Sequence, residues 1–296
     1  MQAPLSVLYQ GLTDASRREE LSLTTADDHA LAHDLAGEAG QLLLDLRARG
    51  GDPGLLRKAG DRQSHEFLAA RLAARRPGDA VLSEEGVDGK ARLSAERVWI
   101  VDPLDGTREF GEEGRADWAV HVALWERGEL TAGAVALPAQ GKVLSTLDPP
   151  SRDVAQAPAA RPVRSLATGR APGGTEGRPS GEQLRLVVSR TRASQLVKDV
   201  AAALKAEFVP CGSAGAKTAT VIAGETDVYL HSGGFYEWDT AAPVAVARAA
   251  GFHTSRIDGT DLVYNREDPL LPDILVCRPA IADLLLDAIR EATHAN

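Results

Sequence analysis

Residues 98–110 read VWIVDPLDGTREF, and this stretch constrains the fold and the chemistry of the chain more than any other. Its large apolar residues predict a buried strand, and Asp102 and Asp105 follow that strand directly. Pro103 fixes its own φ and Gly106 permits a tight turn, so both carboxylates should be held firmly at the strand end. Two carboxylates that face one space repel each other unless a cation lies between them. The stretch therefore predicts a cation site.

An Asp-Pro turn with a capping aspartate is the alternative interpretation, since such turns are common in loops. The apolar run before the motif and the Gly-Thr pair after it favour the cation site. Mg²⁺ suits this site because it binds hard oxygen ligands, often one or two carboxylates together with waters and a substrate phosphate. If the backbone N–H groups of Gly106 and Thr107 are free, they could also bind a phosphate.

Two further acidic segments lie where predicted strands end. Ser83-Glu84-Glu85-Gly86 follows one strand-like run, and Asp239 lies in Glu237-Trp238-Asp239-Thr240, where a strand gives way to a helix. Each segment alone is more often a solvated turn or a helix cap than a metal ligand. Three acidic strand ends in one chain fit a shared metal cluster better.

Composition and charge exclude several classes of protein. The chain has 296 residues, of which 44 % are hydrophobic, which allows one large domain or two moderate ones that share a cleft. A formal charge of −9 argues against broad binding to nucleic acid or to anionic membranes. Cys211 and Cys277 have no CxxC spacing, so we expect reduced thiols and no zinc site. With no signal-peptide pattern and no long apolar stretch, we expect a cytoplasmic protein.

Residues 12–150 are expected to form an N-terminal α+β half. Its helices are predicted over about 25–49, capped by Thr25 or Asp27 and stopped by Gly50-Gly51, and over about 61–75. Its strands are predicted at 80–85 and 98–102, followed by an antiparallel meander over 118–147 with turns at Arg127-Gly128 and Gln140-Gly141.

Residues 151–182 are expected to form a flexible connection, because the segment from 148 onward is rich in Pro, Ala, Arg, Gly and Ser. Residues 183–296 should form a C-terminal α/β half, since strand-like and helical patterns alternate there. The expected helices cover about 192–206, 239–250 and 279–292, with another from about 214; strands fall at LRLVVS, FVPCG and DVYLH and near 252–257 and 273–277.

VDPLDGTREF, the upstream SEEG and the downstream EWDTAA resemble the three signatures of the inositol monophosphatase superfamily of magnesium-dependent, lithium-sensitive phosphatases. Their order and spacing agree from about residue 25 to the end. The REF sequence after DGT, the GSAGAK segment and EWDTAAP are similar to the CysQ-type branch, the 3′(2′),5′-bisphosphate nucleotidases. The resemblance implies a layered αβαβα sandwich of the α/β (α+β) class, with a metal cleft between its halves.

The resemblance also implies the roles of several side chains. Two or three Mg²⁺ ions would be held by Glu84, Asp102, Asp105, Asp239 and the backbone carbonyl of Leu104. Glu84, Thr107 and Asp61 would be catalytic, with Thr107 and Asp61 positioning the attacking water. The family usually shows Thr-x-Ala-Asp upstream, and Lys58-Ala59-Gly60-Asp61 keeps only the aspartate. A helix cap is therefore an equal alternative for Asp61, and the third metal depends on it.

The segment CGSAGAKT over 211–218 is not a P-loop, since Cys211 and Ala216 stand where that motif needs glycine. A glycine-rich turn that opens a helix, with Ser213 and Lys217 nearby, can still bind an anion. The alternative is a helix start packed on a strand with a surface lysine. The expected substrate-binding residues are Asp105, Gly106, Thr107, Ser213, Lys217 and Asp239.

Tyr236 and Trp238 could stack on a base or belong to the core, and His121 and His231 are expected to be structural. The resemblance implies hydrolysis of 3′-phosphoadenosine 5′-phosphate to AMP and phosphate, a step in sulfur assimilation. Inositol-1-phosphate, histidinol-phosphate or fructose-1,6-bisphosphate are alternative substrates, because the metal cradle is shared. A non-catalytic nucleotide sensor is a further alternative, which the presence of Thr107 disfavours. The expected partner is a small phosphorylated molecule, and a homodimer is one expected assembly.

Overall fold

The computed structural model describes residues 14–156, 183–191 and 193–294. Two five-stranded sheets organise these residues, and the first has the strand order β1-β2-β3-β4-β5. Its strands are β1 (Ala80–Ser83), β2 (Arg97–Asp105), β3 (Ala119–Glu126), β4 (Glu129–Leu137) and β5 (Lys142–Ser145). β1 pairs with β2 in parallel, and the remaining neighbours are antiparallel.

The first sheet is buried on both faces. Successive residues of a strand point to opposite faces, so Val98 and Ile100 join one core while Trp99 and Val101 join another. α1 (Asp14–Ala48) and α2 (Pro53–Arg75) cover the outer face, and α6 (Ala214–Ile222) and α7 (Glu237–Ala249) cover the inner one. Because β2 is buried on both faces, its sequence is apolar at every position from 98 to 101.

The second sheet has the order β7-β6-β8-β10-β9. Its strands are β6 (Arg185–Ser189), β7 (Glu207–Cys211), β8 (Val228–Tyr236), β9 (His253–Ser255) and β10 (Leu270–Cys277). β6 is parallel to β7 and β8, whereas β10 is antiparallel to β8 and β9. α5 (Gln195–Leu204) and α8 (Ala282–His294) pack on the face away from the first sheet.

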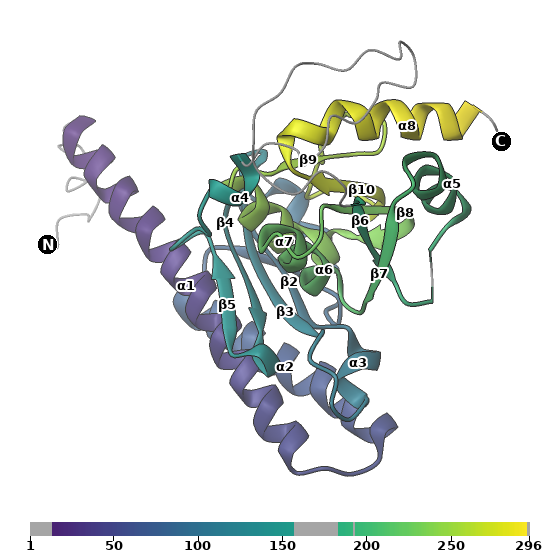
Figure 1. Ribbon diagram of the computed structural model, residues 1–296. Coiled ribbons are helices and arrows are strands. Elements are labelled where there is room, and N and C mark those ends of the chain that lie inside the picture. The colour runs from purple at the N-terminus through teal and green to yellow at the C-terminus, as the bar shows by residue number, and fades with distance from the viewer. Residues whose placement is uncertain (1–13, 157–182, 192, 295–296) are drawn as a thin grey trace, which may run out of the picture.

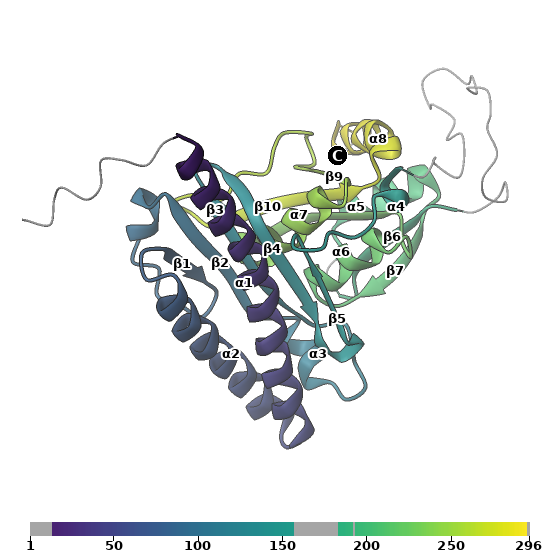
Figure 2. The same ribbon diagram turned by 90° about the vertical axis from the view of Figure 1, so that its left-hand side faces the viewer.

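The five layers are therefore α1/α2, the first sheet, α6/α7, the second sheet and α5/α8. One core lies beneath each outer pair of helices, and the central core lies on both sides of α6/α7. Figure 1 shows α1 along one side of the molecule and α8 with α5 on the other, and Figure 2 shows the sheets as separate layers. The predicted αβαβα sandwich is confirmed. Three short 3₁₀ turns, η2 (Ala91–Ser94), η3 (Pro138–Gln140) and η4 (Pro279–Ile281), complete the described elements.

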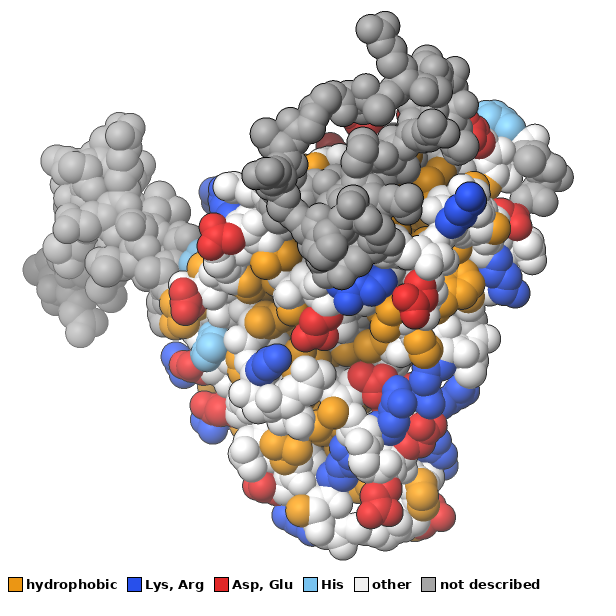
Figure 3. Space-filling view, in the orientation of Figure 1, with side chains coloured by type: hydrophobic (Ala, Val, Ile, Leu, Met, Phe, Trp, Pro, Cys, Tyr) orange, Lys and Arg blue, Asp and Glu red, His pale blue; other side chains and the backbone are white. Residues whose placement is uncertain are grey.

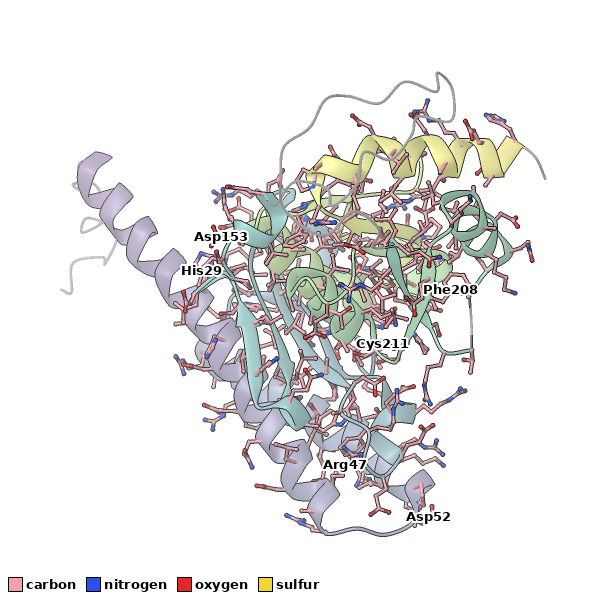
Figure 4. All side chains as sticks on the ribbon, viewed as in Figure 1. His29, Arg47, Asp52, Asp153, Phe208 and Cys211 are labelled. Atoms are coloured by element: carbon pink, nitrogen blue, oxygen red, sulfur yellow. The ribbon has the colours of Figure 1, made fainter. Side chains whose placement is uncertain are left out.

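Both N-terminal helices begin earlier than predicted. α1 starts at Asp14, so the predicted cap at Thr25 or Asp27 is wrong, whereas its end before Gly50 is as expected. α2 starts at Pro53, because Asp52 caps it: Asp52 Oδ1 accepts hydrogen bonds from the N–H groups of Gly54 and Leu55, each at 2.9 Å. Figure 4 labels Asp52 in the connection between α1 and α2.

From the sequence, the acidic motif was expected to follow its strand, but the structure places it within the strand. β2 continues through Pro103 to Asp105, with an irregularity between Asp102 and Asp105 in its pairing with β3. Asp102 lies opposite His121 and Asp105 lies opposite Ala119, so two residues of β2 are accommodated as a bulge. β1, in contrast, ends at Ser83, and Glu84 follows it. The meander over 118–147 and both of its turns are confirmed.

Within the expected connection, Asp153–Gln156 forms the short helix α4, and 157–182 lie outside the described residues. The strands and helices expected after residue 183 are present, with β8 extending through Tyr236. None of the described helices is long and apolar enough to span a membrane. On the face in Figure 3, acidic and basic side chains of the described residues are interspersed.

Candidate active site and metal centre

A cavity of about 400 Å³ lies where β2, α3 (Thr107–Gly111), the start of α6 and the junction of β8 with α7 meet. All but one of the site residues predicted from the sequence line it. These are Glu84, Asp102, Leu104, Asp105, Gly106, Thr107, Ser213, Lys217 and Asp239. The remaining one, Asp61, reaches Thr107 from α2.

Three carboxylates converge in this cavity. One oxygen from each of Asp102, Asp105 and Asp239 lies within 4.8 Å of the others. Backbone groups orient them: the Leu104 N–H donates to Asp102 Oδ1 at 3.0 Å, and the Tyr236 N–H donates to Asp239 Oδ2 at 2.7 Å. The bulge in β2 and the first turn of α7 thus bring two distant segments to one point.

Their protonation behaviour matches a site built for a cation. Burial raises the pKa of Asp102 well above its ordinary value, and the charges of Glu84 and Asp105 raise it further. Burial, followed by Asp105, raises the pKa of Asp239 to about 6. Glu84 lines the cavity and its side chain is exposed. Desolvation by the surrounding protein, followed by the charges of Asp239 and Asp105, nevertheless raises its pKa to about 7. A divalent cation would favour the ionised forms, so this oxygen-donor set fits Mg²⁺.

Asp105 behaves differently from its neighbours. Burial alone would raise its pKa, but His121, Lys217 and the N–H of Gly215 together hold it below the ordinary value. The Gly215 N–H donates to Asp105 Oδ2 at 2.8 Å, and His121 Nε2 lies 3.1 Å from the same oxygen. One carboxylate of the cluster is therefore ionised without any cation.

Thr107 and Asp61 form a second polar group beside the carboxylates. Thr107 Oγ1 lies 3.2 Å from Asp61 Oδ1 and 3.1 Å from the carbonyl oxygen of Leu104. A hydroxyl has one proton, so it donates to one of these oxygens at a time. Asp61 lies inside α2, whose cap is Asp52, so the helix-cap alternative for Asp61 is wrong. Burial, and then Glu85, raises the pKa of Asp61 to about 6, although the Thr107 hydroxyl lowers it.

Gly106 precedes α3 with a φ of +83°, which favours glycine. A Cβ at this position would come within 3.0 Å of Ser213 Cβ and 3.3 Å of the Asp117 carbonyl oxygen. No side chain of the described residues accepts a capping hydrogen bond at the start of α3. This end of the helix lines the cavity.

Ser213 and Lys217 are buried, whereas an anion site on the surface would leave them exposed. Ser213 is the N-cap of α6 and accepts a hydrogen bond from the Ala216 N–H at 2.9 Å. Lys217 is only 3 % exposed, donates to the carbonyl oxygen of Gly212, and lies 5.3 Å from the centre of the Tyr229 ring. The alternative of a surface lysine is therefore wrong. Burial lowers the pKa of Lys217, although Asp105 opposes this shift.

Several other residues line the cavity, and one of them, His231, was expected from the sequence to be structural. Arg190 lies just after β6 and pairs with Glu109 and Glu112 of the α3 region, with its Nη1 3.1 Å from Glu112 Oε2. His231 and Phe235 are in contact, with ring centres 4.0 Å apart. The sequence did not single out Arg190, although its place directly after a predicted strand was an available signal, and nothing around His231 in the sequence indicates a place in the cavity.

Tyr236 and Trp238 stack on each other rather than only joining the core. Their rings are 4.7 Å apart and nearly parallel, at 9°. Tyr236 lines the cavity and is 45 % exposed, whereas Trp238 packs against the central core. Trp238 therefore fits the core interpretation, whereas stacking of a base on Tyr236 stays a prediction.

The sandwich and its acidic cavity define a known class of protein. The model of the inositol monophosphatase family matches residues 29–294, so the chain belongs to this family. A Mycobacterium tuberculosis protein named 3′-phosphoadenosine 5′-phosphate phosphatase is 49 % identical over 262 residues, 86 % of this chain and 90 % of that protein. The protein of that name in Mycobacterium leprae is 49 % identical over 275 residues, 89 % of this chain and 94 % of its own.

The solved structures include a similar chain from the nucleotidase branch. CysQ from Bacteroides thetaiotaomicron, described as a bacterial member of the inositol monophosphatase family, superimposes with a TM-score of 0.69 at 27 % identity. The match covers 86 % of this chain and 98 % of CysQ.

Proposed function

We propose that this protein is a magnesium-dependent phosphoric monoester hydrolase that converts 3′-phosphoadenosine 5′-phosphate to AMP and phosphate. The observation that carries the proposal is the 49 % identity, over most of both chains, to proteins named for this activity. Consistent with it, the cavity combines converging carboxylates with cationic and aromatic side chains. We further propose that the protein acts in sulfur assimilation in the cytoplasm and that it can form a homodimer.

Glu84, Asp102, Asp105, Asp239 and the carbonyl of Leu104 would hold two or three Mg²⁺ ions. The fit rests on three carboxylate oxygens within 4.8 Å and on pKa values that burial raises in Asp102, Asp239 and Glu84. When bound, Mg²⁺ would supply a lowered pKa for the attacking water and positive charge for the phosphoryl and leaving oxygens.

Thr107 and Asp61 would position the attacking water. A bond forms between the water oxygen and phosphorus, the bond from phosphorus to O3′ breaks, and O3′ leaves with a proton from solvent. The pKa of Asp61, about 6, leaves this carboxylate ionised at neutral pH, so it can accept a proton through the Thr107 hydroxyl. A nucleotide sensor would not need this pair.

The rest of the cavity would receive the nucleoside and its second phosphate. We propose that Asp105, Gly106, Thr107 and Asp239 face the reacting phosphate. Ser213 and Lys217 would face the part of the substrate that does not react, where Lys217 supplies positive charge. The exposed face of Tyr236 offers a surface on which a base can stack.

The test is phosphate release with Mg²⁺ from 3′-phosphoadenosine 5′-phosphate, inositol-1-phosphate and fructose-1,6-bisphosphate in parallel, each repeated with Li⁺. We expect kcat/KM for the nucleotide to exceed the others at least tenfold, about 1.4 kcal/mol of transition-state discrimination, with inhibition by Li⁺. Preference for inositol or sugar phosphate would keep the metal chemistry and overturn the substrate. No turnover of any of them would overturn the enzyme itself.

A further inference from the structure

His121 lies behind the carboxylate cluster, outside the residues that line the cavity. It belongs to β3, in the middle of the first sheet, and its side chain is 0 % exposed. Ala119 and His121 are two residues apart and share a face of the sheet, and Ala119 lies opposite Asp105. The imidazole therefore points toward the carboxylate of Asp105 from within the core.

Each ring nitrogen of His121 faces an oxygen of a different element. Nε2 lies 3.1 Å from Oδ2 of Asp105, at the end of β2. Nδ1 lies 3.1 Å from the carbonyl oxygen of Trp238, the residue before Asp239 in the first turn of α7. The carbonyl oxygen of Trp238 accepts a hydrogen bond from Nδ1, whereas Nε2 only makes a close polar contact with Asp105 Oδ2. The ring therefore connects the backbone beside one carboxylate of the cluster to the side chain of another.

The start of α6 is shaped around this ring. A Cβ on Gly215 would lie 2.2 Å from His121 Nε2 and 2.9 Å from Val135 Cγ1, so any larger residue would displace the imidazole. Without a side chain, Gly215 approaches closely, and its N–H donates to the same Oδ2 of Asp105. Two protein groups thus hold one oxygen of this carboxylate, and its second oxygen can take a cation.

We propose that His121 is a positioning residue that sets the placement of Asp105 relative to Asp239 and thereby the affinity of the cluster for a divalent cation. The inference rests on the proposed metal site. Asp105 ends a strand of the first sheet, whereas Asp239 begins a helix that follows the second sheet, so their separation depends on contacts between layers. His121 contacts both sides of this junction and touches no cavity surface, so it acts only through these partners.

Three substitutions separate positioning from space filling. His121→Phe keeps an aromatic ring but removes both nitrogens. His121→Gln keeps an amide N–H with the reach of Nε2, toward Asp105. His121→Asn keeps one with the reach of Nδ1, toward Trp238. His33→Phe is the control for loss of a histidine hydrogen bond away from the cluster, because half-buried His33 bonds through its ring to Ser145 Oγ at 3.1 Å on the outer face of the first sheet.

The experiment measures Mn²⁺ binding to each purified protein without substrate, from the electron paramagnetic resonance signal of free Mn²⁺. Loss of a partner that orients a metal ligand typically weakens metal binding by about 10- to 100-fold. We expect a Kd for Mn²⁺ in that range above wild type for His121→Phe, a smaller rise for His121→Asn, and near-wild-type binding for His121→Gln and His33→Phe. Melting temperatures in EDTA report folding separately.

A purely structural role would lower the EDTA melting temperature of the His121 variants without ranking their affinities for Mn²⁺. Folded His121→Phe and His121→Asn with Kd values within twofold of wild type would overturn the proposal. If His121→Phe does not fold, equal binding by His121→Asn and His121→Gln overturns it. Wild-type protein that binds no Mn²⁺ would instead overturn the proposed metal site.

Discussion

Asp105 is the carboxylate of the cluster that the protein itself keeps ionised. His121, Lys217 and the Gly215 N–H hold its pKa below the ordinary value, whereas burial raises the pKa of Asp102. An incoming cation therefore meets the charge already present on Asp105 and displaces the proton that burial favours on Asp102. This division of roles within one cluster makes Asp105 the residue whose charge matters most for cation entry.

Replacement of Asp105 by Asn tests this role. The change removes a charge and almost no volume, and the amide oxygen can still accept the Gly215 N–H. We expect kcat/KM to fall by more than about 100-fold, beyond the loss typical for a residue that only orients a metal ligand. The EDTA melting temperature should fall while the fold stays intact, because the folded state holds the pKa of Asp105 below its ordinary value and buried Lys217 loses this partner.

Asp261→Asn makes the same chemical change at an exposed position and should leave turnover unchanged. Substantial activity in Asp105→Asn would refute the metal assignment, since a neutral amide cannot supply the anionic ligand that the proposal requires. Phosphate release and circular dichroism on both variants suffice for the comparison.

At the residue scale, the sequence identifies side chains whose signal is local. Glu84, Asp102 and Asp239 stand next to predicted strands or helix starts, which is why their convergence could be expected. His121 was expected to be structural, because the sequence around a histidine in an apolar run does not indicate which side chain it will contact. Its contact with Asp105 arises only when β3 pairs with β2 across a bulge.

At the scale of elements, α2 shows how a start signal can be present and yet be missed. Asp52-Pro53 is the usual pairing of a capping acid with proline in the first helical position. The following Gly54 weakens the helical pattern, so the helix was expected only from about residue 61. The whole helix then carries Asp61 into position opposite Thr107.

Asp52→Ala removes this cap, leaving the N–H groups of Gly54 and Leu55 without their acceptor. We expect the free energy of unfolding to fall by about 1 kcal/mol, measured by urea denaturation. kcat should be unchanged, because Asp52 lies far along α2 from the cavity lining. Asp52→Asn retains a capping oxygen and should lose little. A full loss in Asp52→Asn, or none in Asp52→Ala, would contradict the capping account.

The other element boundaries depend on partners distant in sequence. β2 extends to Asp105 because β3 supplies hydrogen bonds past the bulge, and no local pattern encodes that pairing. The layer order was expected from the resemblance to the inositol monophosphatase superfamily, whereas the apolar run of residues 98–101 predicted only a buried strand, which the structure buries on both faces. The layering was thus predictable from the motifs that carry the resemblance, and the strand ends were not.

At the scale of the whole molecule, the acidic cavity should make stability depend on pH and on metal together. Glu84, Asp61 and Asp239 have pKa values of about 7, 6 and 6, all above their ordinary values. Between about pH 4 and 7 the folded state then binds more protons than the unfolded state, so stability falls as pH rises. Mg²⁺ binds the ionised groups and should reverse this fall.

Urea denaturation in EDTA at pH 5 and pH 7.5, with and without Mg²⁺, measures this linkage. We expect the metal-free protein to be less stable at pH 7.5, and Mg²⁺ to stabilise it more there than at pH 5. Glu84→Gln removes one of the titrating groups and should flatten the metal-free dependence. If Glu84→Gln and wild type show the same pH dependence, Glu84 does not carry the shifted proton.

The carboxylate of Asp105 comes from the first sheet, and that of Asp239 comes from the first turn of α7 in the central helical layer. A cation bound between them would consequently join these two elements as well as take part in the chemistry, and its concentration would set how often the join is present. Under the proposed metal site, the supply of divalent cation therefore sets both catalysis and the link between the first sheet and the central helical layer.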